Sequence, residues 1–343
     1  MEPCPSKRTR NWHNLPRDVL ILIFMKLELS EVLYNAQLVC SWWRKIAKEP
    51  ELFHIIDVQN LWDFFDIRDY DHTTKTAKDP GILRLNEARH YFETQDYNRM
   101  SKMAIEAINR SCGELVKFSI MKFATDKVLR YIGMKSGNSL KCLRLAKCKQ
   151  VSEKILIQVV KKLPLLEEFE LCYSSFSWKV IKVVGHSCPR LISFRLNRHE
   201  VKHIHYSPYR NEFIRKHVIE RSLRKCEVDD DAFAIAANMP TLRRLHLFGN
   251  SMTDKGLRAI LDKCPHLEYL DLRKCFYIKF GGFLRERCQG IRILRLPDDS
   301  TDDFDFDLED EYVRELHNGI NSDSYSSDPD ELSDKEEEDD CFM

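Results

Sequence analysis

A short pattern of large apolar residues, Leu-x-x-Leu-x-Leu with Phe or Ile allowed, returns along this chain about every 25 residues, with one interval of double length. Each copy contains the alternation that is typical of a β-strand, and helical patterns fill most of the intervals. A period of this length predicts a stack of strand-plus-helix units, an architecture that mainly binds other proteins. The copies begin at Leu115, Leu140, Leu166, Leu191, Leu242, Leu267 and Ile291.

Each copy also predicts a surface residue. Because side chains alternate along a strand, the middle apolar pair of a copy points into the core, and the residue between them points to the concave face. These positions hold three arginines, one histidine and two carboxylates, a set that could bind a mixed-charge or phosphorylated peptide. A row of merely solvated side chains is the alternative. The candidate target-facing residues are Ser119, Arg144, Glu170, Arg195, His246, Asp271 and Arg295.

The intervals between copies have helical patterns. Thr253 can cap a helix that continues to Cys264, and a helix from about Asn98 to Ser111 is expected to cap the array. In the double-length interval, the helix expected over Asp229–Met239 leads directly into the next strand. Residues 198–228 are therefore interpreted as an insertion, and a decayed repeat is the alternative.

The 12 cysteines follow the repeat rather than a disulfide framework. Four stand three residues before the first apolar position of a copy, and two stand eight residues after one. No Cys-x-x-Cys pair occurs, so neither a zinc ribbon nor a redox-active pair is expected. We interpret these thiols as small apolar packing residues at helix ends and turns. They are Cys112, Cys188, Cys264, Cys288, Cys148 and Cys275.

The net charge of zero comes from two opposed parts of the chain. From Asp298 to Met343 there are 20 acidic residues against Arg314 and Lys335, so an arm of about −18 follows a body of about +18. The arm cannot bury enough apolar surface to fold, and a disordered acidic tail is expected. Such a tail would compete with phosphate, so nucleic acid is not expected as a partner, and docking of the tail on the body is the better hypothesis.

The chain offers no segment suited to a membrane. The longest strongly apolar stretch, Val19 to Met25, is too short to span a bilayer, and the N-terminus lacks the apolar core of a secretory signal. A location inside the cell, nuclear and/or cytoplasmic, is expected.

Residues 12–54 have a compact helical pattern. Pro16 suits a first helical position, Ser30 can cap a second helix, and a third helix through Trp42 and Trp43 is stopped by Pro50. This block carries more large apolar side chains than about 40 residues can bury by themselves. It is expected to bury them against a partner.

This block resembles the F-box, the short helical module that docks on the Skp adaptor of SCF-type ubiquitin ligases. The match comprises Leu15-Pro16, Val39-Cys40 and Trp43-Arg44, in order and at suitable spacing. The sequence departs from the family at Leu29-Ser30-Glu31, where F-box proteins often have a turn that contains proline or aspartate. The resemblance implies that the following residues contact the adaptor: Leu15, Pro16, Val19, Leu20, Ile23, Phe24, Leu27, Val39, Cys40 and Trp43.

The array resembles the cysteine-containing class of leucine-rich repeats, and the whole resembles plant F-box/leucine-rich-repeat proteins of the Skp-interacting-partner type. The fold implied is α/β: an N-terminal three-helix F-box, a leucine-rich-repeat horseshoe that forms a right-handed α/β solenoid, and the acidic tail. The function implied is a non-catalytic substrate receptor of a cullin-based ubiquitin ligase, without cofactor or metal. A repeat scaffold without a ligase role is the alternative. The expected boundaries are a basic lead at 1–11, the F-box at 12–54, a connector at 55–97, repeats at 98–297 and the tail at 298–343.

One enzyme motif competes with this interpretation. His199-Glu200-Val201-Lys202-His203 fits the His-Glu-x-x-His pattern of zinc proteases. That chemistry needs both histidines on one helix face, a third ligand and a walled cleft, whereas these residues are expected in a loop of the solenoid. A chance group of surface histidines is therefore the preferred interpretation.

Overall fold

The computed structural model describes residues 15–58, 97–174, 176–198 and 228–303. Its centre is a parallel eight-stranded sheet in which every strand pairs with the next one along the chain. The strands are β1 (Ile55–Val58), β2 (Lys117–Met121), β3 (Cys142–Ala146), β4 (Glu168–Cys172), β5 (Ser193–Asn197), β6 (Arg244–His246), β7 (Tyr269–Asp271) and β8 (Ile293–Arg295).

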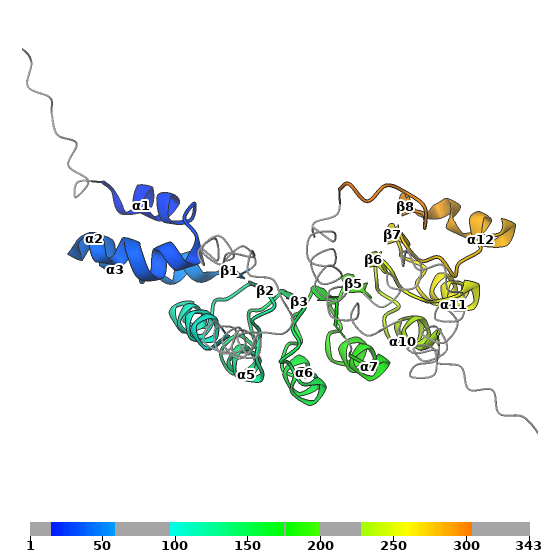
Figure 1. Cartoon of the computed structure of the whole chain (residues 1–343), viewed down its shortest axis with the longest axis horizontal. Coiled ribbons are helices and arrows are strands. Elements are labelled where there is room, and N and C mark those ends of the chain that lie inside the picture. The colour runs from blue at the N-terminus through cyan, green and yellow to red at the C-terminus, as the bar shows by residue number, and fades with distance from the viewer. Residues whose placement is uncertain (1–14, 59–96, 175, 199–227, 304–343) are drawn as a thin grey trace, which may run out of the picture.

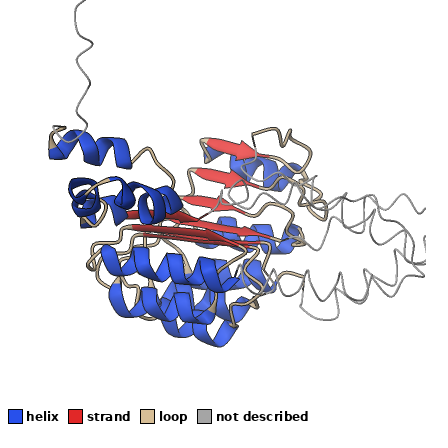
Figure 2. Ribbon diagram, turned by 60° about the vertical axis from the view of Figure 1, so that its left-hand side comes forward, coloured by secondary structure: helices blue, strands red, loops and turns tan. Residues whose placement is uncertain are grey.

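Helices cover one face of this sheet, and the sheet curves so that its other face is concave (Figures 1 and 2). This is the strand-and-helix solenoid that the 25-residue period predicts, and the α/β fold class is confirmed. The covering helices are residues 97–110, α5 (Asp126–Lys135), α6 (Glu153–Val160), α7 (Trp178–Ser187), α10 (Asp230–Asn238), α11 (Asp254–Lys263) and α12 (Gly282–Arg287). No helix in the described ranges has both the length and the hydrophobicity to cross a bilayer.

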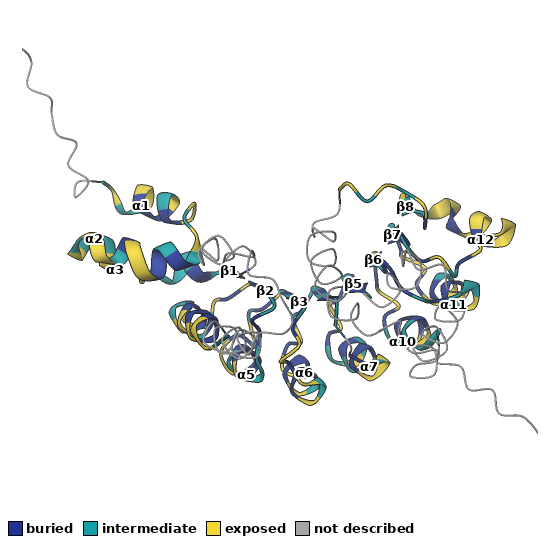
Figure 3. Ribbon diagram, in the orientation of Figure 1, coloured by how far each residue is buried: buried dark blue, intermediate teal, exposed yellow. Residues whose placement is uncertain are grey.

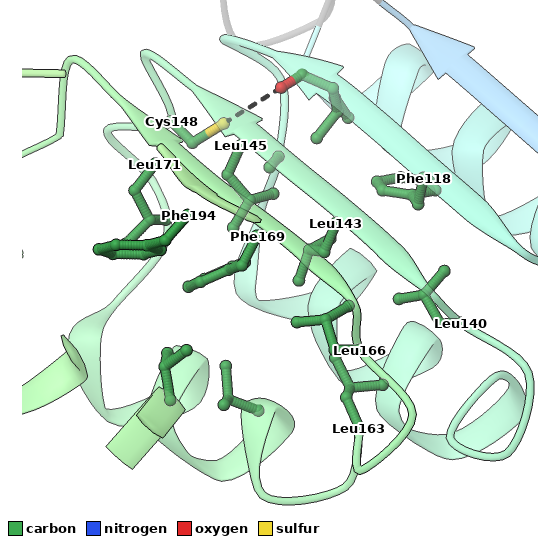
Figure 4. Close-up of a cluster of buried hydrophobic side chains, with 14 of the residues drawn as sticks. Phe118, Leu140, Leu143, Leu145, Cys148, Leu163, Leu166, Phe169, Leu171 and Phe194 are labelled. Atoms are coloured by element: carbon green, nitrogen blue, oxygen red, sulfur yellow. Dashed lines mark hydrogen bonds between the residues drawn. The ribbon is translucent and has the colours of Figure 1, made fainter. Parts of the chain in front are cut away.

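The core consists of apolar side chains stacked in register from strand to strand (Figure 4). Phe118 pairs with Leu143, Leu143 with Phe169, and Phe169 with Phe194, and each of these side chains is at most 1% exposed. The rings of Phe169 and Phe194 stack with their centroids 6.1 Å apart. Burying one such side chain contributes about 1.5–3 kcal/mol to the free energy of folding. Because these side chains pack against those of the adjacent strands, each repeat is stabilised mainly by its neighbours.

The repeat-linked thiols occupy equivalent places in different units. Cys188 and Cys264 end their helices and lie near the carbonyl oxygens of Leu163 and Met239, at 3.5 and 3.4 Å. Cys148 lies 3.1 Å from the carbonyl oxygen of Ala146. These three thiols, together with Cys275 and Cys288, are buried, as expected for packing residues, whereas Cys112 is exposed.

A row of carboxylates joins neighbouring repeats at the helix N-termini. Asp126 accepts hydrogen bonds from the backbone N–H and hydroxyl of Ser152, at 2.7 and 2.8 Å. Asp229 does the same for Thr253, at the same two distances. Thr253 in turn caps α11, as its sequence position predicts. Each carboxylate therefore fixes the start of the next helix in the stack.

The N-terminal module contains α1 (Arg17–Phe24), a wider helical turn over Glu31–Ala36, α2 (Gln37–Val39), α3 (Ser41–Ile46) and a 3₁₀ turn over Pro50–Phe53. The expected cap at Ser30 is wrong, because its side chain makes no capping hydrogen bond and its backbone is already helical.

The module continues directly into the solenoid. β1 lies in the range expected to be a connector, and it pairs with β2 over four residues. Arg110, at the end of helix 97–110, donates hydrogen bonds to the carbonyl oxygen of Ala47 at 2.9 Å and to Gln37 at 3.3 Å. Strand pairing and this side chain together hold the module against the first repeat.

The strands on either side of the double-length interval are neighbours. Phe194 of β5 pairs with Leu245 of β6, and α7 packs against α10. Residues 199–227, which form most of the expected insertion, lie outside the described residues, as does the tail from residue 304. The helix that follows the interval begins at Asp230, close to its expected start.

Candidate functional site

The first candidate surface consists of exposed apolar side chains on the N-terminal module, whose helices α1 and α2 carry exposed residues (Figure 3). Val19 is 40% exposed and Val39 is 61% exposed, and Pro16 is also exposed. Four half-buried members of the predicted adaptor set pack against the module core: Leu15, Ile23, Leu27 and Trp43. Cys40 is also half-buried, and its Sγ accepts a hydrogen bond from the backbone N–H of Trp43.

Two predicted adaptor residues belong to the interior of the module instead. Leu20 is fully buried and Phe24 is 1% exposed. The ring of Phe24 meets Trp43 edge-on, with ring centroids 5.2 Å apart. Leu20 and Phe24 therefore stabilise the module, and the assignment of these two side chains to the adaptor surface is wrong.

The structure adds three exposed apolar side chains that the motif comparison missed. Leu22, Met25 and Leu38 are 63%, 53% and 68% exposed. Leu22 and Met25 follow Val19 at intervals of three, so a helical projection of the sequence around α1 would have placed them on a shared side. The resulting surface, called the apolar module surface below, consists of Pro16, Val19, Leu22, Met25, Leu38 and Val39.

The second candidate surface is the concave face of the sheet. Strand register brings all seven predicted target-facing residues into one line, in which each pairs with the next. Ser119 and Asp271 are buried, so the expectation that these two side chains face a target is wrong. The recognition row, as this line is called below, also includes Asp57, which pairs with Ser119.

Charges in the recognition row are paired with one another. Glu170 lies between two arginines: Arg144 Nε is 2.8 Å from Glu170 Oε1, and Arg195 Nη1 is 3.6 Å from the same oxygen. These side chains are only 16–20% exposed. The two guanidinium groups therefore hold one carboxylate at the centre of the concave face.

A second line of side chains on the same face was missed at the sequence level. Its members precede those of the recognition row by two residues, and they include Cys142, Glu168, Ser193 and Arg244. Arg244 donates a hydrogen bond to Glu168 across the small side chain of Ser193. Period-two alternation would have found this line, because residues two apart share a face.

A recess opens where this second line meets the recognition row. Its volume is about 310 Å³. Two carboxylates and two guanidinium groups surround it in neighbouring pairs, together with one imidazole. The lining residues are Cys142, Glu168, Phe169, Glu170, Ser193, Arg195, Arg244 and His246.

His246 and Asp271 form the next pair along the recognition row. Burial lowers the pKa of His246, and the nearby Arg195 acts in the same direction, so the imidazole is neutral at pH 7. Burial by itself would raise the pKa of Asp271, but hydrogen bonds from His246 and Arg273 bring that pKa well below its usual range. Arg273 is 3% exposed and lies 2.8 Å from Asp271, so a full negative charge is held on Asp271.

The zinc-protease motif at His199 to His203 lies outside the described residues. In the part of the chain that the structure describes, no three His, Cys, Asp or Glu side chains converge in a way that could hold a metal ion. This part of the chain therefore presents two candidate sites, the apolar module surface on the N-terminal helices and the charged concave face of the sheet.

Comparisons with known proteins agree with this division. Residues 12–59 match the F-box-like family model. Residues 210–307 match a model described as FBD-associated F-box protein At5g56370, LRR repeats, and that match begins within the predicted insertion.

Relatives of this chain share both parts. F-box protein SKIP19 of Arabidopsis thaliana is 37% identical over 296 residues, covering 86% of this chain and 80% of the relative. F-box/LRR-repeat protein 23 of the same plant is 35% identical over 305 residues, covering 88% of this chain and 57% of the relative.

Fold and surfaces together define an F-box module joined to a leucine-rich-repeat sheet. With relatives of this identity and coverage, the chain belongs to the plant F-box/leucine-rich-repeat protein family.

Proposed function

We propose that this protein is the substrate-recognition subunit of an SCF-type ubiquitin ligase. The F-box binds a Skp adaptor, and through it a cullin core, while the repeats bind a target protein. Catalysis is supplied by the ligase, and this chain acts by proximity: it raises the effective concentration of the target near the ubiquitin carrier. The proposal places the protein in the nucleus, the cytoplasm or both.

The observation that carries the proposal is the apolar module surface. Six apolar residues of a module of about 45 residues are left exposed, with Leu22, Leu38 and Val39 each more than 60% exposed. The module already has its own buried core of Leu20, Phe24 and neighbouring side chains. Exposed apolar surface beyond such a core indicates a partner interface, and the F-box match supports a Skp adaptor as that partner.

The join between module and solenoid supports the same mechanism. β1 continues the module into the sheet, so the apolar module surface and the recognition row belong to one connected unit. A target on the sheet is then held at a fixed distance from the adaptor. Proximity acts most strongly when the two bound groups are held in a defined geometry.

The proposed target is a mixed-charge segment rather than a phosphorylated one. Arg195 lies beside Glu170, and Arg244 beside Glu168, so the two guanidinium groups of the recess are each matched by a carboxylate. A phosphate would have to displace those carboxylates and would be repelled by them. A segment that carries both an acidic and a basic side chain could exchange partners with both pairs.

The adaptor part of the proposal is tested with the double variant Leu38→Asp, Val39→Asp. Both side chains are exposed, so the module is expected to remain folded while the apolar module surface loses two contacts. The variant loses two apolar contacts that would be buried when the adaptor binds. Calorimetry should therefore show binding of a purified Skp adaptor weakened by about 100-fold or more. The matched control is Met134→Asp on α5, which is 69% exposed and lies outside the module.

If the double variant binds the adaptor as tightly as the unmodified protein, the proposed interface is refuted. The alternative, a repeat scaffold without a ligase role, is compatible with adaptor binding or its absence, and it predicts that no ubiquitin is transferred to bound proteins. If the protein binds the adaptor, ubiquitin transfer to bound proteins in a reconstituted ligase then separates a receptor from a scaffold.

A further inference from the structure

The ladder of apolar side chains in the core has two ends. At the N-terminal end, where the module adjoins the sheet, Ile56 of β1 pairs with Phe118 and is 1% exposed. At the C-terminal end, Leu294 of β8 pairs with Leu270 and is only half-buried, whereas Leu270 is fully buried. The array is therefore closed at one end and open at the other.

The open end exposes positions that the preceding repeat buries. Leu267, Leu270 and Leu272 are at most 6% exposed. Their counterparts in the last repeat are half-buried, and they are called the end face below: Ile291, Leu294 and Leu296. β8 is also the last strand of the sheet in the described ranges, so its outer edge has no described strand beside it. Repeat arrays require a cap at such an end, and open strand edges are usually covered.

The chain turns back directly after β8. The backbone N–H of Asp299 donates to the carbonyl oxygen of Leu296 at 3.1 Å, and the N–H of Leu296 donates to the carboxylate of Asp299 at 2.9 Å. Asp303 accepts hydrogen bonds from Arg273 and from Arg295, the latter at 3.0 Å. These contacts hold residue 303 beside the last two strands.

The residues after 303 alternate strictly between apolar and acidic. Phe304, Phe306 and Leu308 are separated by Asp305 and Asp307. Alternation of this kind is typical of a strand with one buried face. The family model for the repeats also continues to residue 307. Both observations group these residues with the repeats rather than with the acidic tail.

We propose that residues 304–308 form a further strand, antiparallel to β8, which covers the end face. The connection over residues 296–303 suits a hairpin, whereas a parallel strand needs a crossover of about a dozen residues or more. An antiparallel edge strand is common on an otherwise parallel sheet. The backbone of this segment pairs with the open edge of β8, and its apolar side chains pack on the end face.

Side-chain direction agrees with this pairing. Arg295 belongs to the recognition row, so its contact with Asp303 lies on the concave face. Leu294 is the neighbour of Arg295 in β8 and points to the opposite face, toward the helices. In a strand that continues from Asp303, the apolar residues at 304, 306 and 308 also point to that opposite face. They therefore lie on the same side of the sheet as Leu294.

Charge favours this segment over a second copy of the protein as the occupant of the edge. Residues 281–297 hold four arginines against Glu286. Two copies joined edge to edge at β8 would bring both sets of arginines together, whereas Asp305 and Asp307 bring the opposite charge. Attachment through residue 303 also raises the effective concentration of the segment at β8.

This strand does not depend on the proposed ligase function. The end face and the apolar module surface lie at opposite ends of the array (Figure 1). Adaptor binding is therefore expected to be unchanged in the variants below, and failure of one proposal is distinguishable from failure of the other.

The first test is amide hydrogen exchange of the full-length protein. The amides of residues 304–308 should exchange about 100-fold more slowly than those of residues 321–343, which serve as the internal reference. Equal exchange in the two segments would overturn the proposal. Protection that disappears on dilution, together with a change from dimer to monomer, would assign the edge to a second copy and would overturn it as well.

The second test compares two double variants of the full-length chain. Phe304→Ser, Phe306→Ser removes two apolar side chains of the segment and leaves its charge unchanged. The control, Tyr325→Ser, Phe342→Ser, removes two aromatic side chains further along the chain. Amides of β8 should exchange about tenfold faster in the first variant, whereas the control should match the unmodified protein. Equal exchange of β8 in both variants would contradict the added strand.

Discussion

Arg110 offers a direct test of how the F-box module is joined to the repeats. Its guanidinium group donates to the carbonyl oxygen of Ala47, a fully buried residue, at 2.9 Å, and lies 5.7 Å from the ring centroid of Phe53. Replacing Arg110 with Met keeps the apolar stem and the helix propensity but removes these polar contacts. A charged hydrogen bond contributes about 1.5–3 kcal/mol and the ring contact about 0.5–1 kcal/mol. We expect a loss of about 2–4 kcal/mol in the free energy of unfolding.

The assay is urea unfolding combined with amide hydrogen exchange. Exchange should quicken in α3 and β1, next to the lost contacts, while the repeats beyond α5 keep their protection. The control is Arg130→Met, since Arg130 is an exposed residue of α5. If Arg110→Met is as stable as this control, Arg110 does not couple the module to the repeats, and the join depends on strand pairing alone.

Three further predictions concern the packing and charge of the repeats. Gly185→Ala in α7 places a Cβ 2.4 Å from the carbonyl oxygen of Asn238, so we expect a loss of about 1–3 kcal/mol in the free energy of unfolding. Gly133→Ala at the equivalent place in α5 meets only side-chain atoms, of Val159 at 3.4 Å and Lys162 at 3.6 Å, and should gain up to about 1 kcal/mol. Equal midpoints of urea unfolding for the two variants would contradict this. Asp271→Asn removes one of the two carboxylates that contact buried Arg273, the other being Asp303, and should cost about 1.5–3 kcal/mol at pH 7. Because the folded pKa of Asp271 is depressed, the difference from the unmodified protein should shrink as pH falls below about 4, and a constant difference would refute the pairing. The pKa of His246 is also lowered in the folded protein, so protonation favours the unfolded state, and stability should fall as pH drops below about 6.5. The variant His246→Gln should remove this pH dependence. An unchanged pH profile in the variant would exclude His246 as its source.

The sequence by itself determined the repeating architecture and the F-box. Apolar side chains at fixed intervals leave few ways to bury them, and the 25-residue period is satisfied by a strand and a helix per unit. The same alternation placed Arg144, Glu170 and Arg195 in one line across the sheet, which the strand register confirms. The F-box match depends on local residue order, and it is confirmed by the family comparison.

Only the tertiary structure decided which of these side chains are accessible and which charges are paired. A motif gives residue types in order but not their neighbours, so Leu20 and Phe24 could not be distinguished from Val19 until the module's core was known. Arg244 and Glu168 are 76 residues apart along the chain, and they meet because β4, β5 and β6 lie side by side with the small Ser193 between them. Burial and long-range pairing are properties of the packed sheet, because each depends on residues that the chain brings together only when it folds.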